Sequence, residues 1–240
     1  LPANIGDYDK IVVVGQYIEE LLYSDYKSDN VWRDENGISV SFVKGIQDAV
    51  AEYNEANGTS VQVESVVLSE TDGQVAAPTA EQMEMMSQDN VLTVYIPATR
   101  ITMLTGGADA GEGNDRESLD LPRGQAEVGE QLVNNCSNLV VAMHTQSIVN
   151  VDWATQGEKK ADAVLWASYL GEKQGAALAN VLFGKVSPSG RLNTTWYADE
   201  SQLGELQHDY SIYPTASDPQ DIDLDNGGSY GRTYMYFVGD

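Results

Sequence analysis

The sequence DKIVVVG, residues 9–15, places a continuous apolar run between two charged residues and a glycine. Such a run is typical of a strand that is buried on both faces, as the strands of a parallel sheet are. We therefore expect a short buried strand that ends at Gly15 and forms the first strand of a parallel sheet.

Two kinds of apolar pattern alternate along the chain that follows this strand. Residues 39–57 carry apolar side chains at helical spacing, with Gly58 as a C-cap, whereas residues 60–68 alternate as in a strand. Further helices are expected at 79–86, 117–134 and 171–185, and further strands at 91–98 or 101–106, at 138–144, at 161–169 and, after a turn, within 186–197. This order predicts an α/β fold, a flavodoxin-like three-layer α/β/α sandwich with a mostly parallel sheet.

The chain is long enough for one large domain, and no internal repeat or flexible linker interrupts it. We predict a single domain over residues 1–240. Its tail is acidic and loop-rich from about Ala198 and ends in a candidate edge strand, YGRTYMYF (230–237). Because the chain starts at Leu1 without a Met and ends abruptly at Asp240, we expect it to be a piece of a longer protein.

The formal net charge is −24, from 37 acidic and 13 basic side chains. This charge repels phosphate groups and therefore argues against nucleic acid and anionic membranes as partners. No apolar stretch approaches the length that a membrane span needs. A neutral partner such as a sugar is compatible with this charge, and the composition leaves the compartment open between the cytoplasm and the cell exterior.

Metal ligands of the Cys and His type are scarce in this sequence. The only cysteine is Cys136, which we expect to be a buried structural thiol, and the only histidines are His144 and His208. We expect His144 to be a hydrogen-bonded histidine at the end of a strand. The acidic run at 221–225 lacks the glycine and glutamate that a calcium loop requires. No metal and no organic cofactor is expected.

The segment GGADAGEGNDRESLDLP, residues 106–122, places Glu112 between two glycines. Glycines allow turn conformations and leave little bulk around the carboxylate, which suits a residue that reaches into a shared cleft. We expect Asp115 and Arg116 to form a local ion pair that shapes this loop. Asp109 is a second acidic candidate and ranks below Glu112, and an exposed, solvated carboxylate is the alternative for Glu112.

Several motifs occur in a fixed order: KIVVVG, GEG-N-DR-ESLDLP, HTQSIVNVDW, AVLWASYLGEKQGAALANVLFGKVSPSGRL-NTTWY and YGRTYMYF. Together they resemble the C-terminal α/β-sandwich domain of glycoside hydrolase family 3, the β-glucosidases and β-xylosidases. The resemblance covers most of the chain, and the stretch from Gly171 to Tyr197 is its most specific part. The ending is most similar to the subgroup that includes many β-xylosidases.

The resemblance implies a function and a missing partner. In that family an N-terminal (β/α)8 barrel of the same polypeptide supplies an aspartate nucleophile, and the sandwich domain supplies the acid/base glutamate of a motif like E-G-x-D-R. Glu112 holds that position here, ahead of Asp115 and Arg116. The full enzyme is then expected to hydrolyse terminal non-reducing β-D-glycosyl residues of an oligosaccharide or glycoside with retention. The barrel is absent from this chain, so we expect the chain alone to be inactive.

The loop after the first strand carries Tyr23, Tyr26 and Trp32. In related enzymes this loop contributes aromatic platforms near the leaving-group subsite, so Trp32 and Tyr26 are candidate substrate-binding residues, with ordinary loop packing as the alternative. Glucose and xylose both remain possible as the sugar. The rival functions are a non-catalytic α/β domain that binds carbohydrate or a protein partner through an exposed apolar face, and a nucleotide-binding domain. The acidity of the glycine-rich loop disfavours the nucleotide.

Overall fold

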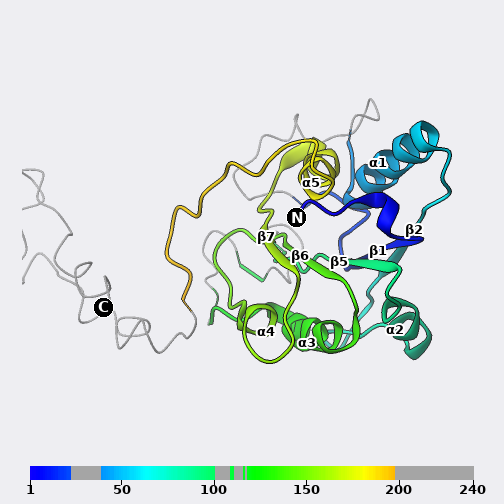
Figure 1. Cartoon of the computed structure of the whole chain (residues 1–240). Coiled ribbons are helices and arrows are strands. Elements are labelled where there is room, and N and C mark those ends of the chain that lie inside the picture. The colour runs from blue at the N-terminus through cyan, green and yellow to red at the C-terminus, as the bar shows by residue number, and fades with distance from the viewer. Residues whose placement is uncertain (23–38, 101–108, 111–115, 117, 198–240) are drawn as a thin grey trace, which may run out of the picture. The chain divides into compact units, whose positions relative to one another are not determined.

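The computed structural model describes residues 1–22, 39–100, 109–110, 116 and 118–197 of the chain (Figure 1). Its contacts divide the chain into two units, Leu1–Trp196 and Tyr197–Asp240. All helices and strands of the described residues belong to the first unit. The edge strand expected at 230–237 lies outside the described residues, and a single domain over residues 1–240 stays a prediction.

The centre of the first unit is a five-stranded sheet in the order β2-β1-β5-β6-β7. All four pairings in it are parallel. The strands are β1 (Lys10–Gly15), β2 (Gln62–Val67), β5 (Val91–Tyr95), β6 (Leu139–Met143) and β7 (Ala163–Trp166). The strand that DKIVVVG predicts is β1, with β2 on one side and β5 on the other, and every residue from Ile11 to Gly15 is buried. The strand order is that of flavodoxin-like folds.

Helices cover both faces of this sheet (Figure 1). On one face α1 (Phe42–Asn57) packs with α5 (Gln174–Leu182), and on the other lie α2 (Ala80–Met86), α3 (Gln125–Asn135) and the short α4 (Asp152–Thr155). Alternate side chains of β1 enter different cores: Ile11 and Val13 face the first pair of helices, and Val12 and Val14 face the other three. The three-layer α/β/α sandwich is therefore confirmed.

The sequence marks the helix ends on both faces. Ser41 caps α1 by accepting a hydrogen bond from the Lys44 amide at 3.2 Å, and Gly58 ends the helix with a φ of 67°, as the pattern predicts. Thr79 and Gln82 form a reciprocal capping box at the start of α2. These contacts satisfy backbone groups that would otherwise lack partners at the helix ends.

Two expectations about elements are wrong. The helix expected to start at Glu117 starts only at Gln125, because Arg123 (φ 63°) and Gly124 (φ 71°) hold a left-handed backbone at the end of a 3-10 turn, Pro122–Gly124. The described residues within 186–197 form no strand. Their side chains are exposed as far as residue 195, so the apolar positions there have no buried face to align them.

A small hairpin also forms that the apolar pattern does not predict. Strand β3 (Glu70–Thr71) pairs antiparallel with β4 (Gln74–Val75) across the turn Asp72-Gly73. Both turn residues have a positive φ, as the tight turn of a hairpin requires. Strands of two residues are too short to show an alternating pattern, so they cannot be predicted. This hairpin nevertheless carries Glu70, which contacts Arg100 and Arg123.

Candidate functional site

The candidate site lies at the carboxyl ends of the two central strands, β1 and β5 (Figure 1). From β1 the chain continues to β2 on one side, whereas from β5 it continues to β6 and β7 on the other. Ligand sites of open parallel sheets form outside the carboxyl ends of the strands at such a switch point. Here Tyr17, which follows β1, accepts a hydrogen bond from Arg100, which follows β5, at 3.3 Å.

The structure describes the two flanks of the glycine-rich segment but not its centre. Glu112 and Asp115 lie outside the described residues, as do Trp32 and Tyr26, so their expected roles stay predictions. Asp109, Ala110 and Arg116 are described. These three residues show where the chain enters and leaves the segment that carries Glu112.

Asp109 is buried in an ion pair and is not an exposed carboxylate. Its oxygens accept hydrogen bonds from the Arg123 guanidinium, and its Oδ2 also accepts one from the Arg100 amide at 2.6 Å. The exposed fractions of the Asp109 and Arg123 side chains are 5% and 6%. The Asp109 carboxylate is enclosed and engaged by these partners, so its ranking below Glu112 has a structural reason.

A second carboxylate, Glu70 of the β3 strand, extends this cluster. Its Oε2 accepts a hydrogen bond from Gln16 at 2.9 Å and lies 3.5 Å from Nη1 of Arg100 and 3.6 Å from Nε of Arg123. The Gln16 hydrogen bond, followed by the two arginine charges, holds the pKa of Glu70 below its ordinary value. Arg123 also lies over the Tyr17 ring, 5.9 Å from its centroid. This cluster is not predictable from the sequence pattern, because its members come from segments that lie far apart in the chain.

The far flank of the segment is tied to the loop after β6. Arg116 Nη2 donates to Ser147 Oγ at 2.9 Å and to the Ile148 carbonyl at 2.6 Å. The Asn150 amide donates to the Leu119 carbonyl at 2.7 Å, which adds a backbone link between the same two loops. Arg116 thus anchors the loop, while its expected ion pair with Asp115 is untested.

Gln125, the first residue of α3, fixes the helix to the end of β5. This side chain is 2% exposed, accepts a hydrogen bond from the Ala98 amide and donates one to the Ala98 carbonyl, both at 2.9 Å. The Tyr95 hydroxyl donates to the Gln125 carbonyl at 2.7 Å. These contacts hold the turn that carries Arg123 against the carboxyl end of the sheet.

His144 lies directly after β6 and is fully buried. Its Nδ1 is 2.5 Å from the Ser168 carbonyl, and its ring packs edge-on against Phe42 and Tyr169, with both centroid distances at 5.0 Å. Burial lowers the pKa of His144 to about 4, against the opposing effect of the Ser168 hydrogen bond. The position matches the expected strand-end histidine, although its buried Nε2 has no hydrogen-bond partner among the described residues.

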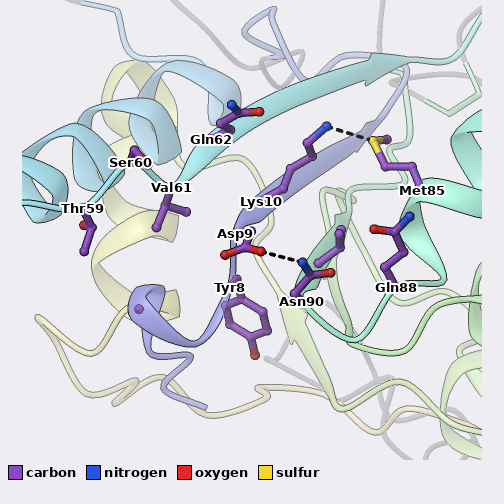
Figure 2. A pocket seen from close by; sticks show the side chains of 12 residues that line it. Tyr8, Asp9, Lys10, Thr59, Ser60, Val61, Gln62, Met85, Gln88 and Asn90 are labelled. Carbon is purple, nitrogen blue, oxygen red and sulfur yellow. Dashed lines mark hydrogen bonds between the residues drawn. The ribbon is translucent and has the colours of Figure 1, made fainter.

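A cleft of about 630 Å³ lies at the opposite, amino-terminal edge of the sheet (Figure 2). Lys10, Gln62 and Val91, the first residues of three strands, line it. Figure 2 shows the Asp9–Asn90 hydrogen bond within this cleft. It lies at the amino ends of the strands, whereas the candidate site lies at their carboxyl ends, and none of the described residues of the candidate site lines it.

Within the described residues, no group of three or more His, Cys, Asp and Glu side chains could hold a metal ion. Cys136 is half-buried, and burial raises the pKa of its thiol. No helix in the described ranges is both long and apolar enough to cross a membrane.

Comparison with protein families gives a match over residues 1–236 to the model described as the glycosyl hydrolase family 3 C-terminal domain. Among curated relatives, the probable β-glucosidase A of Aspergillus terreus is 32% identical over 130 residues, 49% of this chain and 15% of that protein. A xylan 1,4-β-xylosidase of Xylanibacter ruminicola is 31% identical over 52% of this chain and 12% of its own length. An exo-α-(1→6)-L-arabinopyranosidase of Bifidobacterium longum is 29% identical over 80% of this chain and 24% of the relative. The chain thus spans a quarter or less of each of these relatives.

Solved structures give the same picture of the fold. A β-glucosidase from Chaetomium thermophilum superposes with a TM-score of 0.57 at 25% identity, covering 92% of this chain and 25% of that one. A family 3 exo-β-xylosidase superposes with a TM-score of 0.62 at 21% identity, covering the whole of this chain and 27% of that one.

Proposed function

This chain belongs to glycosyl hydrolase family 3 as a C-terminal domain, and from that premise we propose that it supplies the general acid/base of a retaining β-glycosidase. The residue proposed for this role is Glu112, which stands in the E-G-x-D-R pattern. We propose that an N-terminal (β/α)8 barrel of the same polypeptide supplies the nucleophile.

One observation carries the proposal: the segment around Glu112 is anchored on both flanks at the carboxyl edge of the sheet. Asp109 is bonded to Arg100, which follows β5, and to Arg123, in the turn before α3. Arg116 is bonded to the loop after β6. Two fixed flanks with six residues between them limit the region that the carboxylate of Glu112 can reach. This supports a role in which a carboxylate is presented at one place beyond the sheet edge.

The reaction requires one group to change its protonation state twice. In the first step Glu112, as a carboxylic acid, protonates the departing glycosidic oxygen while the nucleophile forms a covalent glycosyl-enzyme. In the second step Glu112, as a carboxylate, removes a proton from water, and that water releases the sugar. The two carboxyl groups of a retaining glycosidase stand about 5–5.5 Å apart, so the barrel must dock against the edge that carries Glu112.

The substrate proposal covers terminal non-reducing β-D-glucosyl and β-D-xylosyl residues. The names of the relatives include a β-glucosidase, a β-xylosidase and an α-L-arabinopyranosidase. Specificity constants of the full-length enzyme for the three p-nitrophenyl glycosides of these sugars rank the candidates. We propose that the β-xyloside or the β-glucoside has the highest specificity constant. A higher value for the α-L-arabinopyranoside would contradict this.

The test of Glu112 is Glu112→Ala in the full-length enzyme, assayed on aryl glycosides with good and poor leaving groups. We expect kcat/KM to fall by about 10²–10⁴ on a poor leaving group and far less on 2,4-dinitrophenyl glycosides, since proton transfer contributes a factor of that order only where the leaving oxygen needs a proton. Azide, which attacks without a general base, should restore turnover and yield a β-glycosyl azide.

The matched control is Glu158→Ala, which removes an exposed carboxylate from the loop after α4. It should behave as the unmodified enzyme with every leaving group. Equal activity of the Glu112→Ala and Glu158→Ala enzymes would remove Glu112 from the mechanism.

The second candidate is a domain that binds carbohydrate or a protein partner without catalysis. The observation in its favour is an apolar groove of about 540 Å³ along β7 and α5, where the exposed Leu170, Val186 and Leu192 gather. If the full-length protein hydrolyses none of the three glycosides while the isolated chain binds a sugar or protein, this candidate replaces the first.

A further inference from the structure

We propose that the buried Asp109–Arg123 ion pair is a positioning device for the acid/base, so that Arg123 is a residue on which catalysis depends without touching substrate. The inference rests on the proposed function, because it takes Glu112 to be the acid/base. Asp109 stands three residues before Glu112 in the chain.

Asp109 is held by its backbone as well as its side chain. Its amide donates to the Arg100 carbonyl at 2.7 Å, and its carboxylate accepts from the Arg100 amide at 2.6 Å. The Arg123 guanidinium closes the arrangement: Nη1 donates to the carboxylate of Asp109, and Nη2 donates to the Ala98 carbonyl at 3.1 Å. One arginine therefore joins the entrance of the glycine-rich segment to the chain that leaves β5.

Burial makes this pair sensitive to the loss of either member. Both side chains are about 95% buried, and a charge left there without its partner would lose most of its stabilisation. Glu70, 3.6 Å from the Arg123 Nε, is a further acceptor for the same guanidinium but belongs to a different hairpin. Asp109 has no other arginine side chain within 3.5 Å in the described residues, since the Arg100 guanidinium is 3.9 Å away.

The backbone of Arg123 supports a specific role for its side chain. Its φ of 63° and ψ of 32° lie in the left-handed region, which is unfavourable for a residue with a long side chain. Glycine would adopt this conformation without strain, yet the chain has arginine there and glycine next to it. Strained residues of this kind persist where surrounding contacts determine them, and here those contacts are Asp109, Ala98 and Glu70.

A shift of the acid by a small distance has a large kinetic effect. A displacement of about 1 Å can lower the rate about 10²-fold when proton transfer requires aligned atoms. The Asp109 and Arg123 side chains are hydrogen-bonded to each other and almost fully buried. We therefore expect the pair to act on the reaction by fixing the position of the chain three residues before Glu112.

The experiment uses two variants of the full-length enzyme, Arg123→Gly and Asp109→Asn. Glycine removes the ion pair and suits the left-handed backbone, and asparagine keeps the shape of the side chain and removes its charge. For both variants we expect kcat/KM to fall by about 30-fold or more on a phenyl glycoside and by less than about threefold on a 2,4-dinitrophenyl glycoside. Arg123→Lys, which keeps the charge but not the two-nitrogen geometry, should recover part of the loss.

Controls separate positioning from folding and from the proposed function itself. Arg191→Gly removes an exposed arginine away from the ion pair and should leave both substrates unaffected. A loss of equal size on both substrates, or no loss, in folded Arg123→Gly and Asp109→Asn enzymes overturns the positioning role. Glu112→Ala is assayed in parallel: if it shows the leaving-group dependence and the ion-pair variants do not, the inference fails and the proposed function stands. If Glu112→Ala shows no dependence on the leaving group, both the inference and the proposed function fail.

Discussion

At the scale of single residues, His144 gives the fold a dependence on pH. Burial lowers the pKa of the folded His144 to about 4, whereas an unfolded histidine binds a proton below about pH 6.5. Between these values the unfolded chain binds more protons, so the free energy of unfolding rises with pH and the full contribution is present above pH 6.5. The shift in pKa means that the free energy of unfolding falls by about 3 kcal/mol on account of His144 as the pH falls from 7 to 4.

The substitution His144→Gln tests this sign, because glutamine carries no charge at any pH. We expect the variant to lose less stability than the unmodified chain between pH 7 and 4, as measured by urea unfolding at half-unit intervals. The carboxylates of the acidic surface contribute equally to both proteins, so the difference between the two curves isolates His144. Parallel curves, or a His144 ring-proton resonance that titrates near pH 6.5, would contradict the assignment.

Residue identity predicts part of the candidate site and leaves the rest hidden. The glycines around Glu112 and the acid at Asp109 are visible in the sequence, and Arg116 is visible as a residue that shapes the loop. The pairing of Asp109 with Arg123 cannot be predicted from the sequence. It depends on a left-handed backbone at Arg123, a conformation that arginine rarely adopts. Glu70 joins the cluster only through a two-residue strand.

At the scale of elements, the contact between α1 and α5 depends on two glycines. A Cβ added at Gly175 would lie 1.8 Å from the Ser41 carbonyl oxygen, and one added at Gly45 would lie 2.0 Å from the Gly175 carbonyl carbon. These are backbone atoms, so the helices would have to separate. We expect Gly175→Ala to lower the free energy of unfolding by about 2 kcal/mol or more, since overpacking outweighs the gain of about 1 kcal/mol in helix propensity.

Chemical denaturation at constant pH measures this change, with Gly190→Ala as the control. A Cβ at Gly190 meets nothing within 4 Å, and its φ is not positive, so its effect should stay within about 0.5 kcal/mol. A Gly175→Ala protein as stable as Gly190→Ala would mean that the two helices do not approach so closely.

The elements that periodicity predicts well are those with a buried face or a strong end signal. The buried strands β1, β5 and β6 and the helix ending at Gly58 follow directly from their patterns. Apolar spacing continues through the turn at Arg123 and Gly124, so the pattern predicts a start of α3 that is too early. The strand expected within 186–197 failed for the opposite reason, as its apolar residues face solvent as far as residue 195.

At the scale of the whole molecule, a retaining glycosidase needs two free carboxyl groups. Among the described residues of the candidate site, neither carboxyl group of the cluster is free. Glu70 is engaged by Gln16 and two arginines, and Asp109 is engaged by Arg100 and Arg123. A nucleophile must approach the anomeric carbon without such partners. Within the proposed function, this chain therefore carries half of a catalytic pair.

We accordingly expect the purified 240-residue chain to fold but not to hydrolyse aryl β-glycosides, including 2,4-dinitrophenyl substrates that need no acid. The activated substrate makes the test specific, because a lone acid/base would contribute nothing to it, whereas a nucleophile within this chain would still act. Circular dichroism establishes that the sample is folded, and release of dinitrophenolate is followed over hours against the full-length enzyme. Release above the uncatalysed rate that persists in Glu112→Ala would place a nucleophile in this chain and contradict the division of the active site between two domains.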